Sequence, residues 1–369
     1  MKNRFKVAML SAVKVNAAAA LCTLLLLTPA PGRAQAQPNA QAAARAALAK
    51  ATFEATARVL TLYDRQGKLV RTIGEPAAYG WHALSPDGKR LAVNRRDPTT
   101  QDIDLLVFDL STGASTRIAS SPAAKPGLVW SPDGSQIVYA SIMGYGSVGL
   151  YRVAANGTGT AELLYKHSAN PNDADNFNAT STDWSSDGRF LTFNDNKGRL
   201  YVLPLNPVGG GPSGPQGRKA TEVLSQFRPG AGRFSPDSRF LSFSSDQSGK
   251  WEVYVRPFDP SAPDGAAPAA GPWQISDQGG WCTCSWREDG KEFYYMTQDG
   301  AVMAVEVSTT PTFTWGRPQL LLKVPDSDTQ NTILANSFSA DGQQFLFAIP
   351  PKPRGTGFPR QTKIGRAHV

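Results

Sequence analysis

The sequence predicts an all-β fold built from copies of one four-stranded unit. Three observations predict it: a tight turn recurs six times, a run of β-forming residues follows each turn, and two more strand-like segments separate successive copies. In the turn 131–134 (SPDG), proline presets φ and glycine accepts a positive φ, which indicates a hairpin. The segment 136–140 after it is apolar on both faces, as in a strand covered by two neighbouring sheets.

The aspartates of the six turns mark the period of the repeat. The intervals between them are 46, 54, 50, 52 and 52 residues. A period of about 50 residues with four strands per unit is typical of a β-propeller. The turn itself explains these carboxylates, because Asp oxygens accept hydrogen bonds from nearby backbone N–H groups, and we prefer this explanation to a metal site. The six residues are Asp87, Asp133, Asp187, Asp237, Asp289 and Asp341.

The two ends of the repeat region complement each other. A strand pair, 58–64 and 68–74, precedes the first hairpin, whereas the last hairpin, 338–347, is followed by no clear second pair. We therefore predict that the start and the end of the chain share one blade, which closes the ring and removes free sheet edges. The result is a six-bladed β-propeller with four-stranded blades, closed by pairing the N-terminal outer strands with the C-terminal hairpin.

The repeated [WF]-S-x-D-G turns and the six-fold count resemble TolB-like β-propellers of WD-like repeats. Stretches such as YGWHALSPDGKRLAVNRRD and WQISDQGGWCTCSWREDGKEFYYMTQDG are especially similar to propeller domains attached to bacterial serine/threonine kinases or to transcriptional regulators. The sequence contains no Gly-rich phosphate loop and no His-Arg-Asp catalytic loop, so kinase activity does not follow from the resemblance. The resemblance implies contact with an extended segment of a partner protein at the channel mouth.

The terminal segments differ from the repeats in composition. Residues 1–36 combine a basic start, an apolar stretch and an Ala-Gln-Ala sequence, which indicates a cleaved secretion signal rather than a retained membrane anchor. We therefore expect an Ala-rich tether at 37–56, the propeller at 57–350, no transmembrane segment in the mature chain, and a periplasmic or secreted protein. In the tail, 351–369, the end IGRAHV (364–369) corresponds to nucleotides that match a common sequencing adapter, and we interpret it as an artefact.

The charge of the chain excludes one class of partner. The formal net charge of +8 includes five basic residues in 1–36 and Arg366, and the remainder carries about +2. Nucleic-acid binding requires Lys and Arg clustered on one face. We therefore expect no nucleic acid among the partners.

The sequence also lacks the usual catalytic constellations. It contains no Gly-x-Ser-x-Gly elbow, and of its three histidines His82 fits best as a hydrogen-bonded structural residue near the channel. Cys282 and Cys284 fit best as residues buried beside the channel, with a disulfide or a metal pair as the alternatives. We predict a protein without a catalytic residue, a metal or another cofactor.

Loops that join one blade to the next are the predicted binding surface, because the blade walls form the core. These loops offer aromatic, Arg and Asp side chains, and aromatics and Arg anchor many interfaces. Trp81 and Trp281 have an alternative role as caps on neighbouring blades. Loops within blades, such as 94–102 and 244–250, are polar and are expected on the opposite rim. The predicted partner-binding residues are Tyr79, Trp81, Asp173, Asp175, Phe177, Phe227, Arg228 and Trp281.

These features together predict a non-catalytic, exported, monomeric binding module for a protein or peptide at the cell envelope. Two alternatives stay open. One is a propeller enzyme of the lactonase or sugar dehydrogenase type, which bound metal or quinone would reveal. The other is a sensor ectodomain of a kinase-type signalling system, which a neighbouring kinase or regulator gene would indicate.

Overall fold

The structure is a computed structural model, and it describes residues 56–143, 147–166, 180–195, 197–205, 218–227, 229–261, 270–324 and 336–351. The chain divides into two compact units, 1–55 and 56–369, and all described residues belong to the second. The predicted secretion signal, nearly all of the tether and the tail beyond Pro351 lie outside the described residues. Within the described ranges every regular element is a β-strand.

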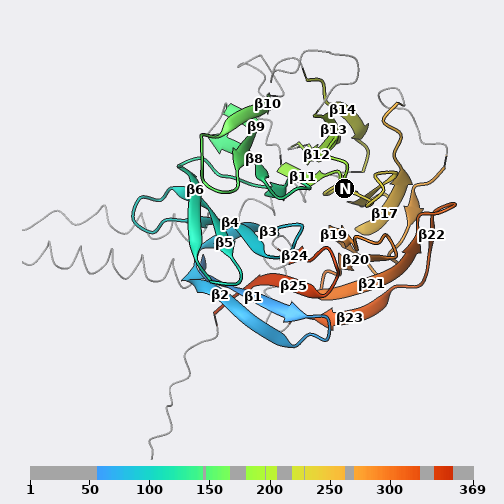
Figure 1. The fold of residues 1–369 in the computed structure, drawn as a ribbon. Coiled ribbons are helices and arrows are strands. Elements are labelled where there is room, and N and C mark those ends of the chain that lie inside the picture. Colours follow the sequence, from blue (N-terminus) through green and yellow to red (C-terminus); the bar gives the residue numbers. More distant parts are fainter. Residues whose placement is uncertain are drawn as a thin grey trace, which may run out of the picture. The chain divides into compact units, whose positions relative to one another are not determined.

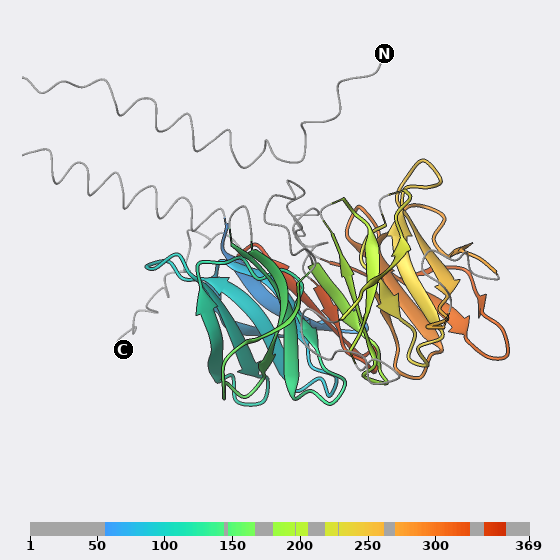
Figure 2. The same cartoon turned by 90° about the horizontal axis from the view of Figure 1, so that it is seen from above.

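Six antiparallel sheets surround a central axis, as Figure 1 shows. The turned view in Figure 2 shows the sheets standing side by side. The first sheet consists of β3 (Tyr79–Leu84), β4 (Arg90–Arg96), β5 (Ile103–Asp109) and β6 (Ser115–Ser121). The second sheet consists of β7 (Val129–Trp130), β8 (Gln136–Met143), β9 (Ser147–Ala154) and β10 (Glu162–Lys166). In both sheets the strand that comes first in the chain is the innermost.

The next two sheets repeat this order. The third consists of β11 (Thr180–Trp184), β12 (Phe190–Asn194), β13 (Leu200–Pro204) and β14 (Thr221–Leu224). The fourth consists of β15 (Arg233–Phe234), β16 (Phe240–Ser245), β17 (Glu252–Pro257) and β18 (Trp273–Gln274). The Gly- and Pro-rich segments 209–217 and 260–272, between the outer strands of these two sheets, lie mostly outside the described residues.

The fifth sheet has one strand more than predicted. It consists of β19 (Trp281–Trp286), β20 (Glu292–Met296), β21 (Ala301–Ser308), β22 (Thr314–Trp315) and β23 (Gln319–Lys323). Both β22 and β23 pair with β21, but β22 pairs with residues 307–308 and β23 with residues 301–304. The outermost position is therefore filled by two short strands in succession.

The sixth sheet joins the two ends of the propeller, as predicted. It has the order β2 (Leu69–Ala77), β1 (Arg58–Asp64), β25 (Gln344–Ile349) and β24 (Asn336–Phe338). Strand β1 pairs antiparallel with β25 over six residues, from Val59 opposite Ile349 to Asp64 opposite Gln344. In Figure 1 the blue β1 lies beside the red β25. The ring is closed by hydrogen bonds between segments far apart in sequence.

The core consists of apolar clusters between adjacent blades. One cluster joins Leu62 of β1, Leu91 of β4 and Leu346 of β25, each at most 1 % exposed. Strand β5 is buried along its length except for its last residue, which agrees with the prediction of strands that are apolar on both faces. Full burial of one such side chain is worth about 1.5–3 kcal/mol, so the blade contacts dominate the stability of the ring.

The six predicted turns join the two inner strands of each blade and have the expected chemistry. In five of them a Ser hydroxyl donates to the Asp, as Ser131 does to Asp133 over 2.5 Å. In the fifth turn Arg287 takes this place and donates from Nε to Asp289 over 2.7 Å. The turn glycines have φ near +70°, and Ser238, which replaces one of them, has φ 56°. These hydrogen bonds within the turns account for the positions of the six carboxylates.

The expectation about the intra-blade loops is wrong. Tyr79, at the start of β3, pairs with Arg95, near the end of β4, so the blade connectors and the loops after each second strand lie on the same face. Two hydrogen bonds join these loops directly, from Asp246 N to Phe227 O and from Gly280 N to Trp251 O. The physical reason is that consecutive antiparallel strands reverse direction, so every second connection returns to the same face. We call this side the connector face, and the side with the six Asp turns the turn face.

Candidate functional site

The innermost strands of all six blades surround a cavity of about 310 Å³ on the axis. It is lined by residues at the starts of these strands and by residues near the connector-face ends of the second strands. The lining combines aromatic, small polar and glycine residues, among them Trp81, His82, Gly127, Ser181, Asn194, Gly230, Arg233, Ser244, Trp281, Cys284, Ser337 and Phe338. We call this cavity the central channel.

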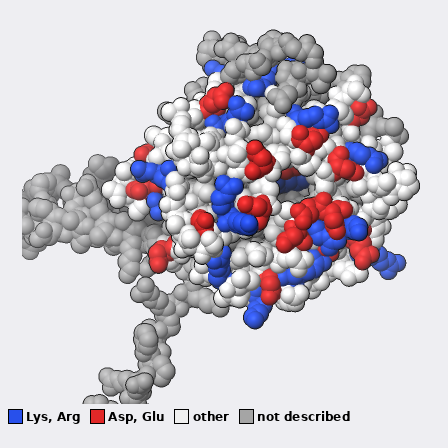
Figure 3. All heavy atoms as spheres, viewed as in Figure 1, with Lys and Arg blue, Asp and Glu red and all other residues white. Residues whose placement is uncertain are grey.

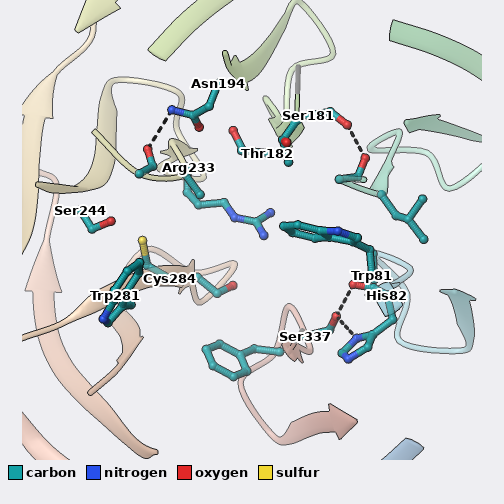
Figure 4. Close-up of a pocket in the computed structure, with 18 of the residues that line it drawn as sticks. Trp81, His82, Ser181, Thr182, Asn194, Arg233, Ser244, Trp281, Cys284 and Ser337 are labelled. Atoms are coloured by element: carbon teal, nitrogen blue, oxygen red, sulfur yellow. Dashed lines mark hydrogen bonds between the residues drawn. The ribbon is translucent and has the colours of Figure 1, made fainter. Parts of the chain in front are cut away.

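Trp81 and His82 are adjacent in β3, yet they have different roles at the channel. The ring of Trp81 projects into the middle of the cavity in Figure 4, while the residue also packs against the core cluster of the first two blades. His82 is 6 % exposed, and its Nδ1 lies 3.0 Å from Ser337 Oγ. Because Ser337 donates its hydroxyl to the His82 carbonyl over 3.0 Å, the imidazole Nδ1 is the donor in this pair. The prediction of a hydrogen-bonded histidine beside the channel is confirmed.

Trp281 lines the channel from the fifth blade. Its ring stacks on that of Trp251, with centroids 4.7 Å apart and an angle of 20° between the planes. Trp251 comes from an intra-blade loop of the fourth blade, so the stacked pair bridges two blades on the connector face. Each of Trp81 and Trp281 packs against a core cluster and also lines the channel, and their role in partner binding stays a prediction.

Cys284 also lines the channel, at 1 % exposure. The burial expected for this residue is confirmed, but it is disulfide-bonded rather than a free thiol. The other two cysteines of the sequence are Cys22 and Cys282, whose side chains lie outside the described residues.

One charged side chain stands out in the channel wall. Arg233, from the two-residue strand β15, forms an ion pair with Asp183 of β11, with 3.4 Å between Nη1 and Oδ1. Asp183 also accepts a 2.7 Å hydrogen bond from the backbone N–H of Phe234. Burial raises the pKa of Asp183 despite the nearby guanidinium. Figure 4 shows the Arg233 side chain reaching across the cavity toward Trp81.

Asn194, at the end of β12, places its amide at the same wall. Its Nδ2 donates to the backbone carbonyls of Pro229 and Gly230, over 3.0 and 3.3 Å. Because the nitrogen faces these carbonyls, the oxygen Oδ1 must face the other way, and this fixes the orientation of the amide. Neither Asn194 Oδ1 nor Arg233 Nε has a hydrogen-bond partner among the described residues, although both atoms are buried.

The structure brings together two of the eight predicted partner-binding residues, Trp81 and Trp281. Tyr79 lies in the core instead, 8 % exposed, and its hydroxyl donates to the Glu75 carbonyl over 3.0 Å. The reason is that β2 and β3 together cover residues 69–84 except Ala78, so Tyr79 belongs to a strand and not to a connector loop. Phe227 is 53 % exposed on the connector face and does not line the channel. Asp173, Asp175, Phe177 and Arg228 lie outside the described residues.

Sequence reasoning missed Arg233, Asn194 and Ser337 as channel residues. Each lies on an inner strand or at the end of a second strand, positions that the repeat itself identifies. In each copy, the residues just before the turn motif belong to the innermost strand. Aligning the six copies on their aspartates would have marked Arg233 as a basic residue on the channel wall.

Charge on the outer surface is mixed in sign. Figure 3 shows Lys and Arg interspersed with Asp and Glu over one face of the disc, rather than one basic area. Within the described ranges no group of three or more His, Cys, Asp and Glu side chains is placed to hold a metal ion. The same residues include no helix with the length and apolar character of a membrane span.

Comparison with known proteins identifies the fold. No protein-family model and no curated protein sequence matches the chain. A solved structure of a TolB-type protein from Agrobacterium tumefaciens is 17 % identical and superposes with a TM-score of 0.54, over 79 % of this chain and 98 % of that one. The fold is that of a TolB-like six-bladed β-propeller.

Two further solved structures are similar at lower TM-scores. TolB from Acinetobacter baumannii is 14 % identical, with a TM-score of 0.46 over 79 % of this chain and 63 % of that one. A 6-phosphogluconolactonase-type protein from Bacteroides fragilis is 17 % identical, with a TM-score of 0.49 over 80 % and 88 % of the two chains. The fold assignment of this TolB-like propeller follows from its own six sheets and from the Agrobacterium structure.

Proposed function

We propose that this TolB-like propeller is a non-catalytic binding module that receives an extended segment of a partner protein in its central channel, at the cell envelope. The observation that carries the proposal is the cavity between all six inner strands, with Trp81 and Trp281 in its wall. A closed ring leaves the channel and the loops around it as the places where side chains vary without disturbing the blades. Tryptophan is among the residue types that contribute most to binding energy at protein interfaces.

The size of the channel favours a segment over a folded domain. Its volume of about 310 Å³ is at the lower end of the range of ligand pockets, about 300–1,000 Å³. Such a space admits a few residues of extended chain. The composition of residues 1–36 supports export, since a basic start followed by an apolar stretch and small residues is typical of secretion signals. We accordingly place the protein in the periplasm or outside the cell.

Retention of partners from an envelope extract tests the proposal. The immobilised mature protein is compared with the double variant Trp81→Ala/Trp281→Ala and with the control Trp315→Ala. Trp315 is 40 % exposed on the outer strand β22 and does not line the channel. It is therefore a tryptophan of the same protein at a position outside the proposed site. We expect the double variant to lose specific partners and the control to keep them. Equal retention by all three proteins would contradict the proposal.

The same purified protein distinguishes the enzyme alternative. A bound metal or quinone in the wild type, together with hydrolysis or oxidation of a small substrate, would replace binding by catalysis as the function. Folding of both variants is checked by thermal unfolding, because Trp81 and Trp281 each contact a core cluster. A lower melting temperature is expected for the double variant, and retention is therefore measured well below it.

A further inference from the structure

The buried polar atoms of the described residues point to the chemistry of the channel ligand. Only three buried side-chain polar atoms among them lack a hydrogen-bond partner, namely Arg95 Nε, Asn194 Oδ1 and Arg233 Nε. Two of the three residues line the central channel. Leaving a buried donor or acceptor unpaired costs about 1–3 kcal/mol, so native proteins usually satisfy such atoms through the protein, water or a ligand.

The Arg233 guanidinium is only partly used by the protein. Among the described residues its one hydrogen-bonding partner is Asp183, through Nη1 at the long distance of 3.4 Å. The side chain is 34 % exposed, and no Asp or Glu is among the residues that line the cavity. A guanidinium has five donors in a fixed planar arrangement that matches the two oxygens of a carboxylate. Several donors of Arg233 therefore remain for an anionic group in the channel.

Asn194 lines the cavity near Arg233. Its Oδ1 accepts no bond from the described residues, and its orientation is fixed by the Nδ2 contacts with Pro229 and Gly230. Figure 4 shows Asn194 and Arg233 on the same side of the cavity. Because Asn194 Oδ1 has almost no accessible surface, the exposed part of the Arg233 guanidinium is the group that a ligand in the channel can reach. An acidic side chain or a free C-terminal carboxylate of a peptide offers the anionic acceptor that this guanidinium requires.

We propose that the channel selects an acidic peptide segment, whose carboxylate is bound by the exposed part of the Arg233 guanidinium. This inference rests on the proposed function, since it names the chemistry of the segment that the channel receives. It assigns Arg233 a binding role in addition to its structural contact with Asp183. Hydrogen bonds to charged groups are stronger than neutral ones, so the carboxylate is expected to dominate the selectivity.

Two pools of random decapeptides test the inference. The acidic pool contains Asp and Glu and ends in a free carboxylate, whereas the neutral pool has Asn and Gln at the same positions and an amidated end. Immobilised full-length protein is incubated with both pools, and the retained peptides are quantified by mass spectrometry. We expect the wild type to retain the acidic pool roughly 10-fold more than the neutral pool. Arg233→Gln should reduce this preference to about one.

Arg95→Gln is the matched control. Like Arg233, Arg95 is 34 % exposed, is paired with an aspartate and has a buried Nε without a partner, but it does not line the channel. The control should keep the full preference for the acidic pool. Because Arg233→Gln leaves Asp183 without its ion pair, the double variant Asp183→Asn/Arg233→Gln is measured as well. This double variant leaves no unpaired carboxylate at position 183, and it should also lose the preference for the acidic pool.

The outcomes separate the inference from the proposed function. An undiminished acidic preference in both Arg233 variants, or an equal loss in Arg95→Gln, would overturn the inference. Equal retention of both pools by the wild type, abolished by Trp81→Ala/Trp281→Ala, would overturn the inference while the proposed function stands. No retention of either pool would overturn the inference and count against peptide binding in the channel as such.

Discussion

Arg65 and Glu292 form an ion pair with 2.5 Å between Nη2 and Oε1, although 227 positions separate them in the sequence. Arg65 belongs to the turn between β1 and β2, and Glu292 begins β20 of the fifth blade. The same guanidinium donates from Nη1 to Tyr294 Oη over 2.9 Å and to the Gly342 carbonyl over 3.2 Å. The turn between β1 and β2 is thus bound both to the hairpin β24–β25 of its own blade and to β20 of the fifth blade.

Removal of this contact should weaken the closed ring. Glu292 is 7 % exposed, and hydrogen bonds from Arg65 and Tyr294 hold its pKa below the usual value although burial acts in the opposite direction. We expect Arg65→Ala to lower the free energy of unfolding by about 1–3 kcal/mol, because it leaves a buried carboxylate with one fewer donor. Urea unfolding followed by tryptophan fluorescence measures the change.

An exposed ion pair within one blade provides the comparison. Arg152 and Glu162 are 2.9 Å apart, and their side chains are 30 % and 63 % exposed. Surface pairs of this kind contribute about 0–1 kcal/mol, so Arg152→Ala should have little effect. If both substitutions cost the same, the Arg65 contact has no special role in closure.

Deletion of residues 58–74 tests closure on a larger scale. It removes β1 and most of β2, so that β25 loses the neighbour with which it pairs from Gln344 to Ile349. We expect the cooperative thermal transition to disappear, because β25 becomes an unpaired sheet edge and the core residues that packed against Leu62, among them Leu91 and Leu346, become exposed. A chain without residues 1–55, which belong to the other compact unit, is the control. An unchanged melting temperature after the first deletion would contradict ring closure.

The hydrogen bonds of the turn aspartates should make the folded state less stable in acid. The Ser131 hydroxyl, together with the Ser135 N–H and hydroxyl, lowers the pKa of Asp133 from 3.8 to about 2. Since the pKa is lower in the folded state, the contribution is present above pH 3.8 and is lost as the pH falls toward 2. Ser131→Ala should therefore lower the melting temperature at pH 6 more than at pH 2. A difference between the two proteins that does not depend on pH would argue against this coupling.

Ser238 occupies a turn position at which five other copies have glycine. Its φ of 56° lies in the left-handed region, where a side chain costs about 1 kcal/mol. Ser238→Gly should therefore raise the free energy of unfolding by roughly 0.5–1 kcal/mol. The reverse substitution, Gly188→Ser, at φ 76° and with open space around the site, should lower it by a similar amount. Changes of the same sign in both variants would refute the conformational explanation.

The parts of the fold that sequence reasoning found are those with local causes. The six turns are identifiable because Ser, Asp and Gly in one short segment make the contacts that define them, as in Ser131 and Asp133. Closure of the ring was predictable because the first strand pair has no hairpin of its own, while the last hairpin is followed by no second strand pair. Together they make one complete blade. The double outer strand β22–β23 depends on pairing with β21, and the extension of β2 from the predicted end at residue 74 to Ala77 depends on pairing with β1. No local sequence pattern reveals such pairing.

The candidate site was found only in part for the same reason. Trp81 and Trp281 attracted attention as large aromatics in connectors, and both line the channel. Tyr79 has the same character but points into the core, since strand alternation decides which side chains face inward. Arg233 and Asn194 were singled out because each has a buried polar atom without a hydrogen-bond partner among the described residues. Such an unpaired atom can be recognised only in the folded structure.

Photo-crosslinking from inside the channel tests the central claim most directly. The full-length protein carries a photoreactive phenylalanine analogue at position 81 or, as the control, at position 315, and is expressed and irradiated in its own cells. We predict a crosslinked partner protein from position 81 and none from position 315, because Trp81 projects into the cavity and Trp315 lies on an outer strand. Crosslinks from position 315 alone, or none from position 81, would contradict binding in the central channel.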